Sequence, residues 1–377
     1  MASARAPFVD DPTSRAHHTH DGGAEGVAAA VRSVLPALDP DDTALGVRQL
    51  SGGITNQLYL VTRRDGAPVW DGGDDASGGR CEGVIVRLFG QGTEAFVDRE
   101  LENRVFARLS SLGLAPRFLG CFQNGRVEQF LPARALEPPE MGLTAPVDFV
   151  SMIATALAEL HATPMPLEGG PALWTKLERF FDLADAVVFE DEDRQRRLRE
   201  LDLPALRRTY EQLKARVCEL AASPHMAWEL VLTHNDMLSG NILWSEGWPR
   251  VRLIDYEYAG PSYRAYDMAN HFCEHAGFSA DFEAGFPGED VRRRFLAAYL
   301  RGSGVEPAQA DGGAAEGWEV ALEHFVLLSH LFWGVWSLVQ ASLSSIDFDF
   351  LGYAELRKTG LRYHMRTLTR VHGVDAP

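Results

Sequence analysis

Two hydrophobic patterns divide the chain. In the first 131 residues, short apolar runs typical of strands predominate, and the clearest is the run at 84–89. Helical spacing fits residues 26–38 and 98–112. Further strands are expected in a hairpin over residues 49–62, with Gly52 and Gly53 at its tip, and at 117–122 and 126–131 on either side of the turn 123–125. These elements predict a small, sheet-rich amino-terminal lobe.

After Pro132 the spacing of apolar residues becomes mainly helical. Residues 147–161 are amphipathic, with one face made of Phe149, Ile153, Ala156, Leu157 and Leu160. Further helices are expected at 174–183, at 194–222 and from 266 to the end, where a Gly-, Ala- and Glu-rich loop at 302–317 interrupts them; short strands are expected at 230–233, 242–244 and 251–254. The pattern predicts a larger, helical carboxyl-terminal lobe.

The fold class that follows is α+β, in two lobes. We place the amino-terminal lobe at residues 26–131 and the carboxyl-terminal lobe at 132–377. Residues 1–25, rich in Ala, His, Gly and Asp, are expected to form a disordered tail. The Gly- and Asp-rich residues 63–83 are expected to form a surface insertion between two strands. The sequence does not decide the oligomeric state, so a homodimer stays open.

Charge and cysteine content narrow the range of partners. With 36 basic and 53 acidic residues, the net charge of −17 disfavours nucleic acid and anionic membranes. Residues 325–346 contain no Asp, Glu, Lys or Arg, but their truly apolar runs are short, which predicts a buried helix and no stable membrane insertion. The four cysteines form no CxxC pair and no secretory signal is visible, so we expect a cytoplasmic protein with reduced thiols.

Residues that carry chemistry gather in one short region. A strand ending at Thr233 leads into a tight loop with His234 and Asp236, and Asn241 stands five residues after Asp236, where the next strand begins. The chain then turns back, and Asp255 follows the returning strand. We expect this small hairpin to bring a carboxylate, an amide and a second carboxylate into one cleft.

This set of groups is the one that phosphoryl transfer needs. A carboxylate orients the attacking hydroxyl group and accepts its proton, and oxygen ligands hold the Mg²⁺ that neutralises the phosphates. The spacing His234-x-Asp236-x4-Asn241, with Asp255 after one more strand, is that of a kinase catalytic loop. No GxxxxGK[ST] motif occurs, so a P-loop fold is disfavoured.

A kinase also needs groups that hold the nucleotide phosphates. The hairpin 51–56, which ends at Asn56, offers backbone N–H groups, although a lone Gly pair is more often a simple turn. Arg87 is the basic residue of the apolar strand and is our candidate phosphate ligand. Glu102 on the following helix is its expected partner, with Glu100 as the less favoured option.

Taken together, these motifs resemble the choline/ethanolamine kinases, whose fold is like that of protein kinases and aminoglycoside phosphotransferases. The resemblance extends from about Ser51 to Tyr363. The segments that carry it are the loop 234–241, the long run 254–274, and the segments 329–336 and 345–348. The run 254–274 is the most specific of these.

The resemblance implies roles for individual residues. Asp236 is the expected catalytic base, and Asn241 and Asp255 are the expected Mg²⁺ ligands. Arg87 takes the place of the usual kinase lysine that holds the ATP phosphates. The segment 128–131 is the expected hinge that binds adenine through its backbone, with Gln129, Phe130 and Leu131 as its nucleotide-binding residues.

The resemblance also implies a pocket for a small cationic amino alcohol. Glu274 is its expected anion, and its aromatic residues are expected to be Tyr258, Trp333, Trp336, Phe348 and Tyr353. A cationic amine binds well to aromatic faces, by roughly 0.5–2 kcal/mol per ring. Trp333 and Trp336 are three residues apart and share a face of a helix, although two such residues can also belong simply to a core.

The implied activity is ATP-dependent phosphorylation of ethanolamine to phosphoethanolamine, the first step of phosphatidylethanolamine synthesis by the CDP-ethanolamine route. The segments 53–56, 97–99, 173–176 and 346–351 favour an ethanolamine kinase. The segments 272–274 and 239–240 look more like those of choline kinases, and Pro261-Ser262 departs from the usual pattern. The alternatives are a choline kinase or a dual choline/ethanolamine kinase, an aminoglycoside phosphotransferase, and a non-catalytic pseudokinase.

Overall fold

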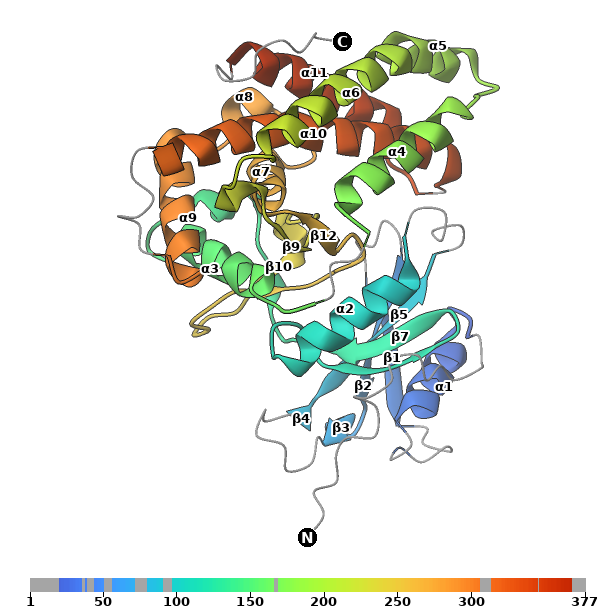
Figure 1. Ribbon diagram of the computed structural model, residues 1–377. Coiled ribbons are helices and arrows are strands. Elements are labelled where there is room, and N and C mark those ends of the chain that lie inside the picture. The colour runs from blue at the N-terminus through green and yellow to red at the C-terminus, as the bar shows by residue number, and fades with distance from the viewer. Residues whose placement is uncertain are drawn as a thin grey trace. The chain divides into compact units, whose positions relative to one another are not determined.

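The chain forms two compact units, residues 1–133 and 134–377. The computed structural model describes residues 20–35, 38, 44–50, 56–71, 80–90, 97–165, 169–305, 313–344 and 346–367 (Figure 1). The boundary between the units lies two residues after the division that the sequence pattern predicts. The tip of the first hairpin, residues 51–55, and most of the predicted tail lie outside the described residues.

The amino-terminal unit is built on a five-stranded antiparallel sheet with strand order β1-β2-β5-β7-β6. Its strands are β1 (Leu45–Leu50), β2 (Asn56–Arg63), β5 (Gly83–Phe89), β6 (Phe118–Phe122) and β7 (Gly125–Gln129). The predicted insertion contains a two-stranded ribbon of β3 (Trp70–Asp71) and β4 (Arg80–Cys81). The expected strands of this lobe are therefore present, and β5 lies at the centre of the sheet between β2 and β7.

Two helices accompany this sheet. Helix α1 (Ala24–Val34) begins two residues earlier than expected and packs Val27 and Val31 into the core, together with Val61, Val84 and other apolar residues of the strands. Helix α2 (Arg99–Ser111) is capped by Asp98, whose side chain accepts hydrogen bonds from the N–H groups of Glu100 and Leu101 at 3.1 and 3.0 Å. This cap fixes the first turn of α2, which carries Glu102.

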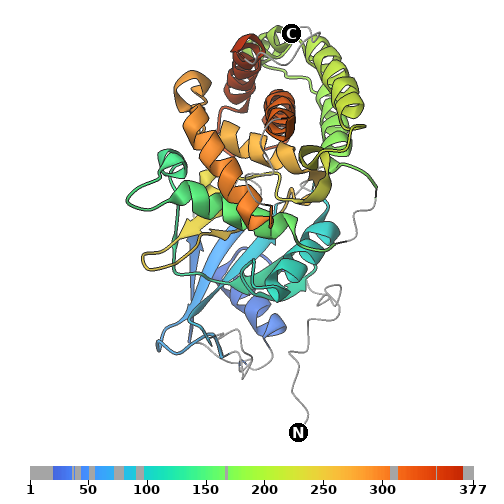
Figure 2. The same cartoon turned by 60° about the vertical axis from the view of Figure 1, so that its left-hand side comes forward.

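The carboxyl-terminal unit is built around the long helix α10 (Gly313–Leu343), as Figure 2 shows. Helix α10 packs against α4 (Ala172–Asp185), α6 (Leu203–Leu220), α7 (Arg264–Glu274) and α11 (Phe350–Thr367). By length and composition, residues 316–343 are apolar enough to cross a membrane, but 89% of their apolar window is buried inside the protein. Residues 325–343 of the apolar stretch thus belong to a core helix, as its interrupted apolar runs predict.

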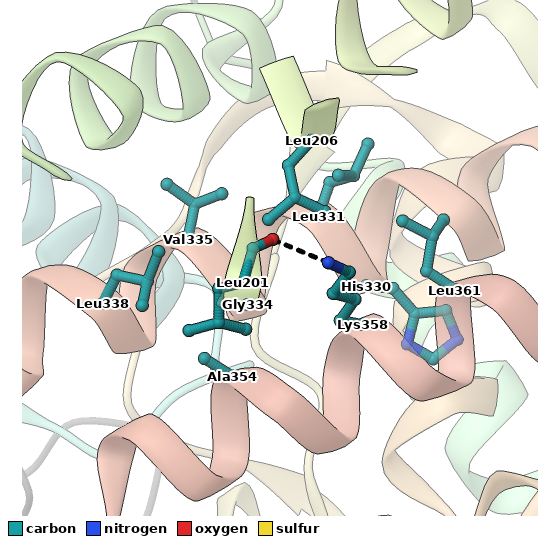
Figure 3. A pocket seen from close by; sticks show the side chains of 10 residues that line it. All are labelled: Leu201, Leu206, His330, Leu331, Gly334, Val335, Leu338, Ala354, Lys358 and Leu361. Carbon is teal, nitrogen blue, oxygen red and sulfur yellow. Dashed lines mark hydrogen bonds between the residues drawn. The ribbon is translucent and has the colours of Figure 1, made fainter. Parts of the chain in front are cut away.

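The other helices of this unit are α3 (Phe149–His161), α5 (Glu192–Leu201), α8 (Phe282–Gly285) and α9 (Glu289–Gly302). The predicted helical stretch 194–222 is two helices, α5 and α6, because Asp202 adopts the left-handed conformation at φ 52°. Pro204 stands in the first turn of α6. Lys358 donates hydrogen bonds to the carbonyl groups of Glu200 and Leu201 at 3.2 and 2.9 Å, which satisfies the end of α5. Figure 3 shows the bond to Leu201.

Short strands complete the unit. Strand β9 (Leu230–Thr233) pairs with β12 (Gly260–Tyr263), and β10 (Ile242–Trp244) pairs with both β8 (Arg134–Ala135) and β11 (Arg252–Leu253). Among the described residues of the unit, 3-10 turns lie at 138–142, 226–228 and 239–241. Cys81, Cys121 and Cys273 are buried, Cys218 is exposed on α6, and all four cysteines are free.

Candidate active site

The loop between β9 and β10 brings the predicted polar residues together. The side-chain amide of Asn241 donates to the backbone oxygen and to Oδ2 of Asp236, both at 2.9 Å. The N–H of Ile254 donates to the carbonyl of Asn241 at 3.0 Å. This bond places the next residue, Asp255, near Asn241. The predicted hairpin geometry is therefore present, and it gathers an amide and two carboxylates.

Two residues of this region hold the left-handed conformation, Asn235 and Asp255, each at φ 64°. Such backbone is costly for residues other than glycine, and it persists only where surrounding contacts enforce it. For Asn235 those contacts are visible: its side chain accepts from Thr233 Oγ1 at 2.9 Å and donates to the carbonyl of Tyr258 at 2.9 Å. The loop is therefore rigidly set before it presents Asp236.

Asp267 on α7 is the main support of the loop. Its carboxylate is fully buried and accepts hydrogen bonds from the N–H groups of His234 and Asn235 at 2.7 and 2.8 Å. His161 Nε2 lies 3.1 Å from the same carboxylate. Burial is the largest single influence and raises the pKa of Asp267, but the contacts with His161 and His234 together outweigh it and the net shift is downward, so the carboxylate stays ionised.

The tautomer of His161 follows from its contact with Asp267. Arg264 donates to the hydroxyl oxygen of Tyr299 at 2.7 Å, and that hydroxyl lies 2.7 Å from His161 Nδ1. Since the ionised carboxylate of Asp267 can only accept, Nε2 carries the hydrogen that points at it. In the neutral imidazole Nδ1 is then an acceptor, and the hydroxyl of Tyr299 donates to it. Sequence reasoning gave no role to Asp267, although it lies in the specific run 254–274.

Asp236 lies in an environment that disfavours its charge. It is 8% exposed, and its pKa is well above the ordinary value because of burial first, then the charges of Glu274, Asp255 and Glu257. The hydrogen bond from Asn241 opposes this shift. Glu257, which sequence reasoning did not single out, is also buried. Four carboxylates in one region attract cations, and a bound cation would relieve their repulsion.

Aromatic side chains surround the same region. The rings of Tyr258 and Trp333 lie 5.3 Å apart at their centroids, as do those of Trp333 and Trp336. Trp336 Nε1 donates to the hydroxyl of Tyr258 at 2.8 Å, and Trp333 Nε1 donates to Asn270 Oδ1 at 2.7 Å. The two tryptophans share one face of α10, as their spacing predicts. Asn270 on α7 is a further polar contact that sequence reasoning missed.

The remaining predicted pocket residues form a second group. Phe348 and Tyr353 lie 5.9 Å apart, and Phe278 lies within 6 Å of both rings, at 5.6 and 5.8 Å. Glu274 ends α7 and forms a buried ion pair with Arg357 of α11, a residue that the sequence reasoning did not select. The predicted anion of the pocket therefore already has a protein partner, 83 residues away in the chain.

In the amino-terminal unit, Arg87 belongs to a buried network of arginine and glutamate side chains. Arg87 Nη2 lies 3.6 Å from Glu128, and Arg126 Nε contacts the same carboxylate at 3.2 Å. Glu102 forms its ion pairs with Arg126 and with Arg99, the latter at 2.7 Å. Arg99 also donates to Asn56 Oδ1 at 3.0 Å.

Glu102, the expected partner of Arg87, forms its ion pairs with Arg99 and Arg126. Arg87 lies in the same network and forms its ion pair with Glu128. Burial raises the pKa of Glu102, but Arg126, Arg99 and Arg87 together lower it below its ordinary value. Glu100, the less favoured option, is exposed on α2. Arg126 was missed, and Glu128 was predicted only as part of the hinge segment, because their side chains lie on a strand that reads simply as part of a sheet.

The predicted hinge lies at the end of β7. The N–H of Gln129 donates to the carbonyl of Arg117 at 2.9 Å, and the N–H of Phe130 donates to that of Gly83 at 3.2 Å. These two backbone donors are engaged within the sheet. Leu131 follows the sheet, and its carbonyl accepts from the N–H of Ala133 at 2.8 Å.

Within the described ranges, no group of three or more His, Cys, Asp or Glu side chains is arranged to hold a metal ion. Mg²⁺ does not need such a group, because it usually keeps water and phosphate oxygens as most of its ligands. The amide nitrogen of Asn241 faces Asp236. Its Oδ1 is therefore directed elsewhere and suits a hard cation.

Comparison with known proteins agrees with this geometry. Residues 47–361 match the family model described as choline/ethanolamine kinase. A probable ethanolamine kinase of Arabidopsis thaliana is 32% identical over 318 residues, 84% of this chain and 79% of that protein. Human ethanolamine kinase 1 is 34% identical over 343 residues, 88% of this chain and 70% of that protein.

Among solved structures, an ethanolamine kinase of Plasmodium vivax is similar at a TM-score of 0.73 and 25% sequence identity, over 92% of this chain and 91% of that one. The fold is thus the protein-kinase-like fold that the family resemblance implies, with a small sheet-rich lobe and a larger helical lobe. Because the family match spans the sheet, the loop 234–241 and the aromatic helix α10, this protein belongs to the choline/ethanolamine kinase family.

Proposed function

We propose that this protein is an ethanolamine kinase, which transfers the γ-phosphoryl group of ATP to the hydroxyl group of ethanolamine. The observation that carries the proposal is that Asp236 lies in one unit of the chain with a cluster of acidic and aromatic side chains, among them Glu274, Tyr258 and Trp333. The similarity to ethanolamine kinases supports the choice of substrate. The product, phosphoethanolamine, would enter phosphatidylethanolamine synthesis by the CDP-ethanolamine route.

Asp236 is the proposed general base. As the ethanolamine oxygen forms its bond to the γ-phosphorus, the bond from that phosphorus to the bridging oxygen breaks and ADP leaves. The hydroxyl proton passes to the carboxylate of Asp236, whose raised pKa makes it a better acceptor than an ordinary aspartate. Asn241 holds the carboxylate in place through its hydrogen bond to Oδ2.

Asn241 and Asp255 would hold Mg²⁺, and the donor set fits such an ion. The side-chain nitrogen of Asn241 contacts Asp236, so its side-chain oxygen Oδ1 is left as a metal ligand. Asp255 is only half-buried, so its carboxylate can reach an ion. When bound, the ion would neutralise phosphate charge. Removing the side chain of Asp255 should therefore weaken the dependence of nucleotide binding on Mg²⁺.

The amino-terminal unit would hold the nucleotide. Arg87 is held in position by Glu128, and the network of Arg99, Arg126 and Glu102 supports it. Among the three predicted hinge residues, Gln129 and Phe130 use their N–H groups within the sheet, so Leu131 is our candidate backbone donor to adenine. Asn56 contributes through its contact with Arg99.

Choline kinase activity, alone or combined with ethanolamine kinase activity, is the second candidate. The aromatic cluster of Tyr258, Trp333 and Trp336 favours it, because a quaternary ammonium group binds through aromatic faces. The free state of all four cysteines supports a cytoplasmic location for either enzyme.

Initial rates of ADP formation with ATP and Mg²⁺ test the proposal. We expect the highest kcat/KM with ethanolamine, a decline through N-methylethanolamine and N,N-dimethylethanolamine to choline, and no turnover of an aminoglycoside such as kanamycin. A preference for choline of about tenfold or more, equal to roughly 1.4 kcal/mol, would support the second candidate instead. ADP formation with none of these amines would contradict both and would favour the pseudokinase alternative.

A further inference from the structure

We propose that Arg357 is a positioning residue that fixes Glu274 in the amine pocket and thereby makes the pocket select amines by their number of N–H donors. The inference rests on the proposed function, because it concerns how the same pocket distinguishes ethanolamine from its methylated relatives. Neither the family motifs nor the sequence pattern assigned a role to Arg357.

Arg357 joins two groups of the pocket. It lies on α11, is 1% exposed, and donates from Nη2 to Glu274 Oε1. Its Nε donates to the hydroxyl of Tyr353 at 2.9 Å. The guanidinium also lies over the rings of Tyr353 and Phe282, at 5.2 and 5.3 Å from their centroids. One planar group thus orients the anion and an aromatic residue of the pocket at the same time.

The ion pair changes what Glu274 offers to a substrate. One carboxylate oxygen is occupied by Arg357, and the positive charge beside it cancels much of the attraction that a bare carboxylate would exert on any cation. What Glu274 keeps is a fixed acceptor oxygen, Oε2, for which the described part of the chain supplies no hydrogen-bond donor. A primary ammonium group can donate to this oxygen, and a quaternary one cannot.

The arginine is also incompletely satisfied. Nη1 is buried and has no hydrogen-bond partner among the described residues. An unmet donor of this kind costs stability, and a buried ion pair by itself contributes little to stability. A hydrophobic side chain of similar size would serve the core equally well, so the contacts to Glu274 and Tyr353 point to a role in the pocket.

The partners of Arg357 are connected to the loop that carries the reacting group. Glu274 ends α7, and Asp267 of the same helix accepts hydrogen bonds from the N–H groups of His234 and Asn235 in that loop. Arg357 therefore orients a carboxylate on the helix that supports the catalytic loop. Loss of Arg357 should move Glu274 and widen the range of amines that the pocket accepts.

The test compares Arg357→Met and Arg357→Lys with wild type and with Arg366→Met, a matched control at an exposed arginine of the same helix. For each protein, kcat and KM are measured with ethanolamine, its mono- and dimethyl forms and choline, together with KM for ATP. Arg357→Lys keeps a positive charge but lacks the planar fork, so it is the conservative variant. Circular dichroism and thermal unfolding show whether each variant is folded.

We expect Arg357→Met to lower the ethanolamine-to-choline ratio of kcat/KM by about tenfold or more, the size of one charge-assisted hydrogen bond. The change should lie mainly in KM for the amines, with KM for ATP unchanged. The ratio for Arg357→Lys should lie between those of wild type and Arg357→Met, and the ratio for Arg366→Met should match that of wild type. If Arg357→Met does not fold, Arg357→Lys decides alone.

The inference would be overturned if a folded Arg357→Met or Arg357→Lys variant showed the same relative kcat/KM values as wild type for ethanolamine, its methylated forms and choline. The proposed function would then still stand. An equal loss with all four amines would also overturn the inference, since that result indicates a purely structural role. A wild-type protein inactive on every amine would instead remove the proposed function.

Discussion

At the scale of single residues, Asp236 illustrates how burial and neighbouring charge prepare one group for a reaction. Its pKa is raised by burial and by three further carboxylates, while Asn241 holds it in one orientation. A carboxylate with these properties accepts a proton more readily than an exposed aspartate does. The charges of Asp255 and Glu257 also favour the arrival of a cationic substrate, so the site prepares both binding and proton transfer.

Asp236→Asn should abolish most of the phosphorylation while nucleotide binding is kept. An amide cannot accept the hydroxyl proton, and positioned general-base catalysis contributes roughly 10²–10⁴-fold to the rate. Steady-state kcat and nucleotide titration by fluorescence check this, with Asp290→Asn on the exposed face of α9 as control. A folded Asp236→Asn variant with near wild-type kcat would rule out the proposed base.

Arg87→Ala should raise KM for ATP far more than KM for the amine, and Arg87→Lys should recover only part of the loss. Lysine keeps the charge but lacks the fork that contacts Glu128 and phosphate oxygens together. The control is Arg104→Ala, at an exposed arginine of α2. Equal KM values for ATP in wild type and Arg87→Ala would place the phosphate-binding group elsewhere.

Whether a contact in the site could be predicted from the sequence depends on how far apart its two residues are along the chain. Asp236, Asn241 and the two tryptophans of α10 were predicted because their spacing is local, within one loop or one helical turn. The pairing of Glu274 with Arg357 was not, because it joins residues 83 positions apart. A charged residue on an amphipathic helix reads as solvent-exposed until the packing of α11 against α10 is known.

At the scale of elements, α7 connects the pocket to the catalytic loop. Asp267 in its first turns supports the loop backbone, Asn270 contacts Trp333, and Glu274 ends the helix in the pocket. One rigid helix of 11 residues therefore fixes the distance between the loop and the amine site. A change at either end should be felt at the other.

Asp267→Asn should lower kcat without a comparable change in KM for ATP. Asparagine offers one acceptor oxygen in place of two, so one loop N–H or the His161 contact loses its partner at a cost of about 1–3 kcal/mol. Activity assays and urea denaturation measure the two effects. An unchanged kcat in a destabilised but folded variant would show that the loop keeps its geometry without this support.

Helix boundaries show the limit of periodicity. The pattern of apolar residues continues through 194–222, yet α5 ends and α6 begins at Asp202, whose side chain accepts from the N–H of Ala205 at 3.2 Å. The signals were an Asp followed by Pro204 two residues later, an N-cap and first-turn combination. Local capping chemistry here outweighs the hydrophobic repeat.

At the scale of the whole molecule, the carboxyl-terminal unit buries a set of neutral histidines. Burial lowers the pKa of each of them, and the set comprises His161, His234, His271, His275, His324, His330 and His364. For His271 and His364 the pKa falls from 6.5 to about 4. His330 and His364 share a hydrogen bond of 2.8 Å between Nε2 and Nδ1.

These shifts predict that stability falls as the pH drops from about 6.5 towards about 4. In that window the unfolded chain takes up protons that the folded chain excludes. A histidine whose pKa falls from 6.5 to about 4 should lower the free energy of unfolding by about 3 kcal/mol over the whole window. Asp236 has the opposite effect on stability, because its pKa is raised in the folded chain. Its single contribution is smaller than the combined contribution of the histidines.

Urea denaturation followed by tryptophan fluorescence measures this change, since seven of the eight tryptophans lie after residue 133. His364→Gln should give a smaller dependence of stability on pH than wild type. A free energy of unfolding that stays constant between pH 7 and pH 5 would contradict the prediction.

The contrast between Cys218 and the other three cysteines has a practical consequence. Because Cys218 alone of the four is exposed, a thiol reagent should modify one site per native molecule, on α6. Cys81, Cys121 and Cys273 become reactive only when their surroundings open. Two of these lie in the amino-terminal unit and one on α7, so the order in which they are labelled, read by peptide mass, reports which lobe opens first.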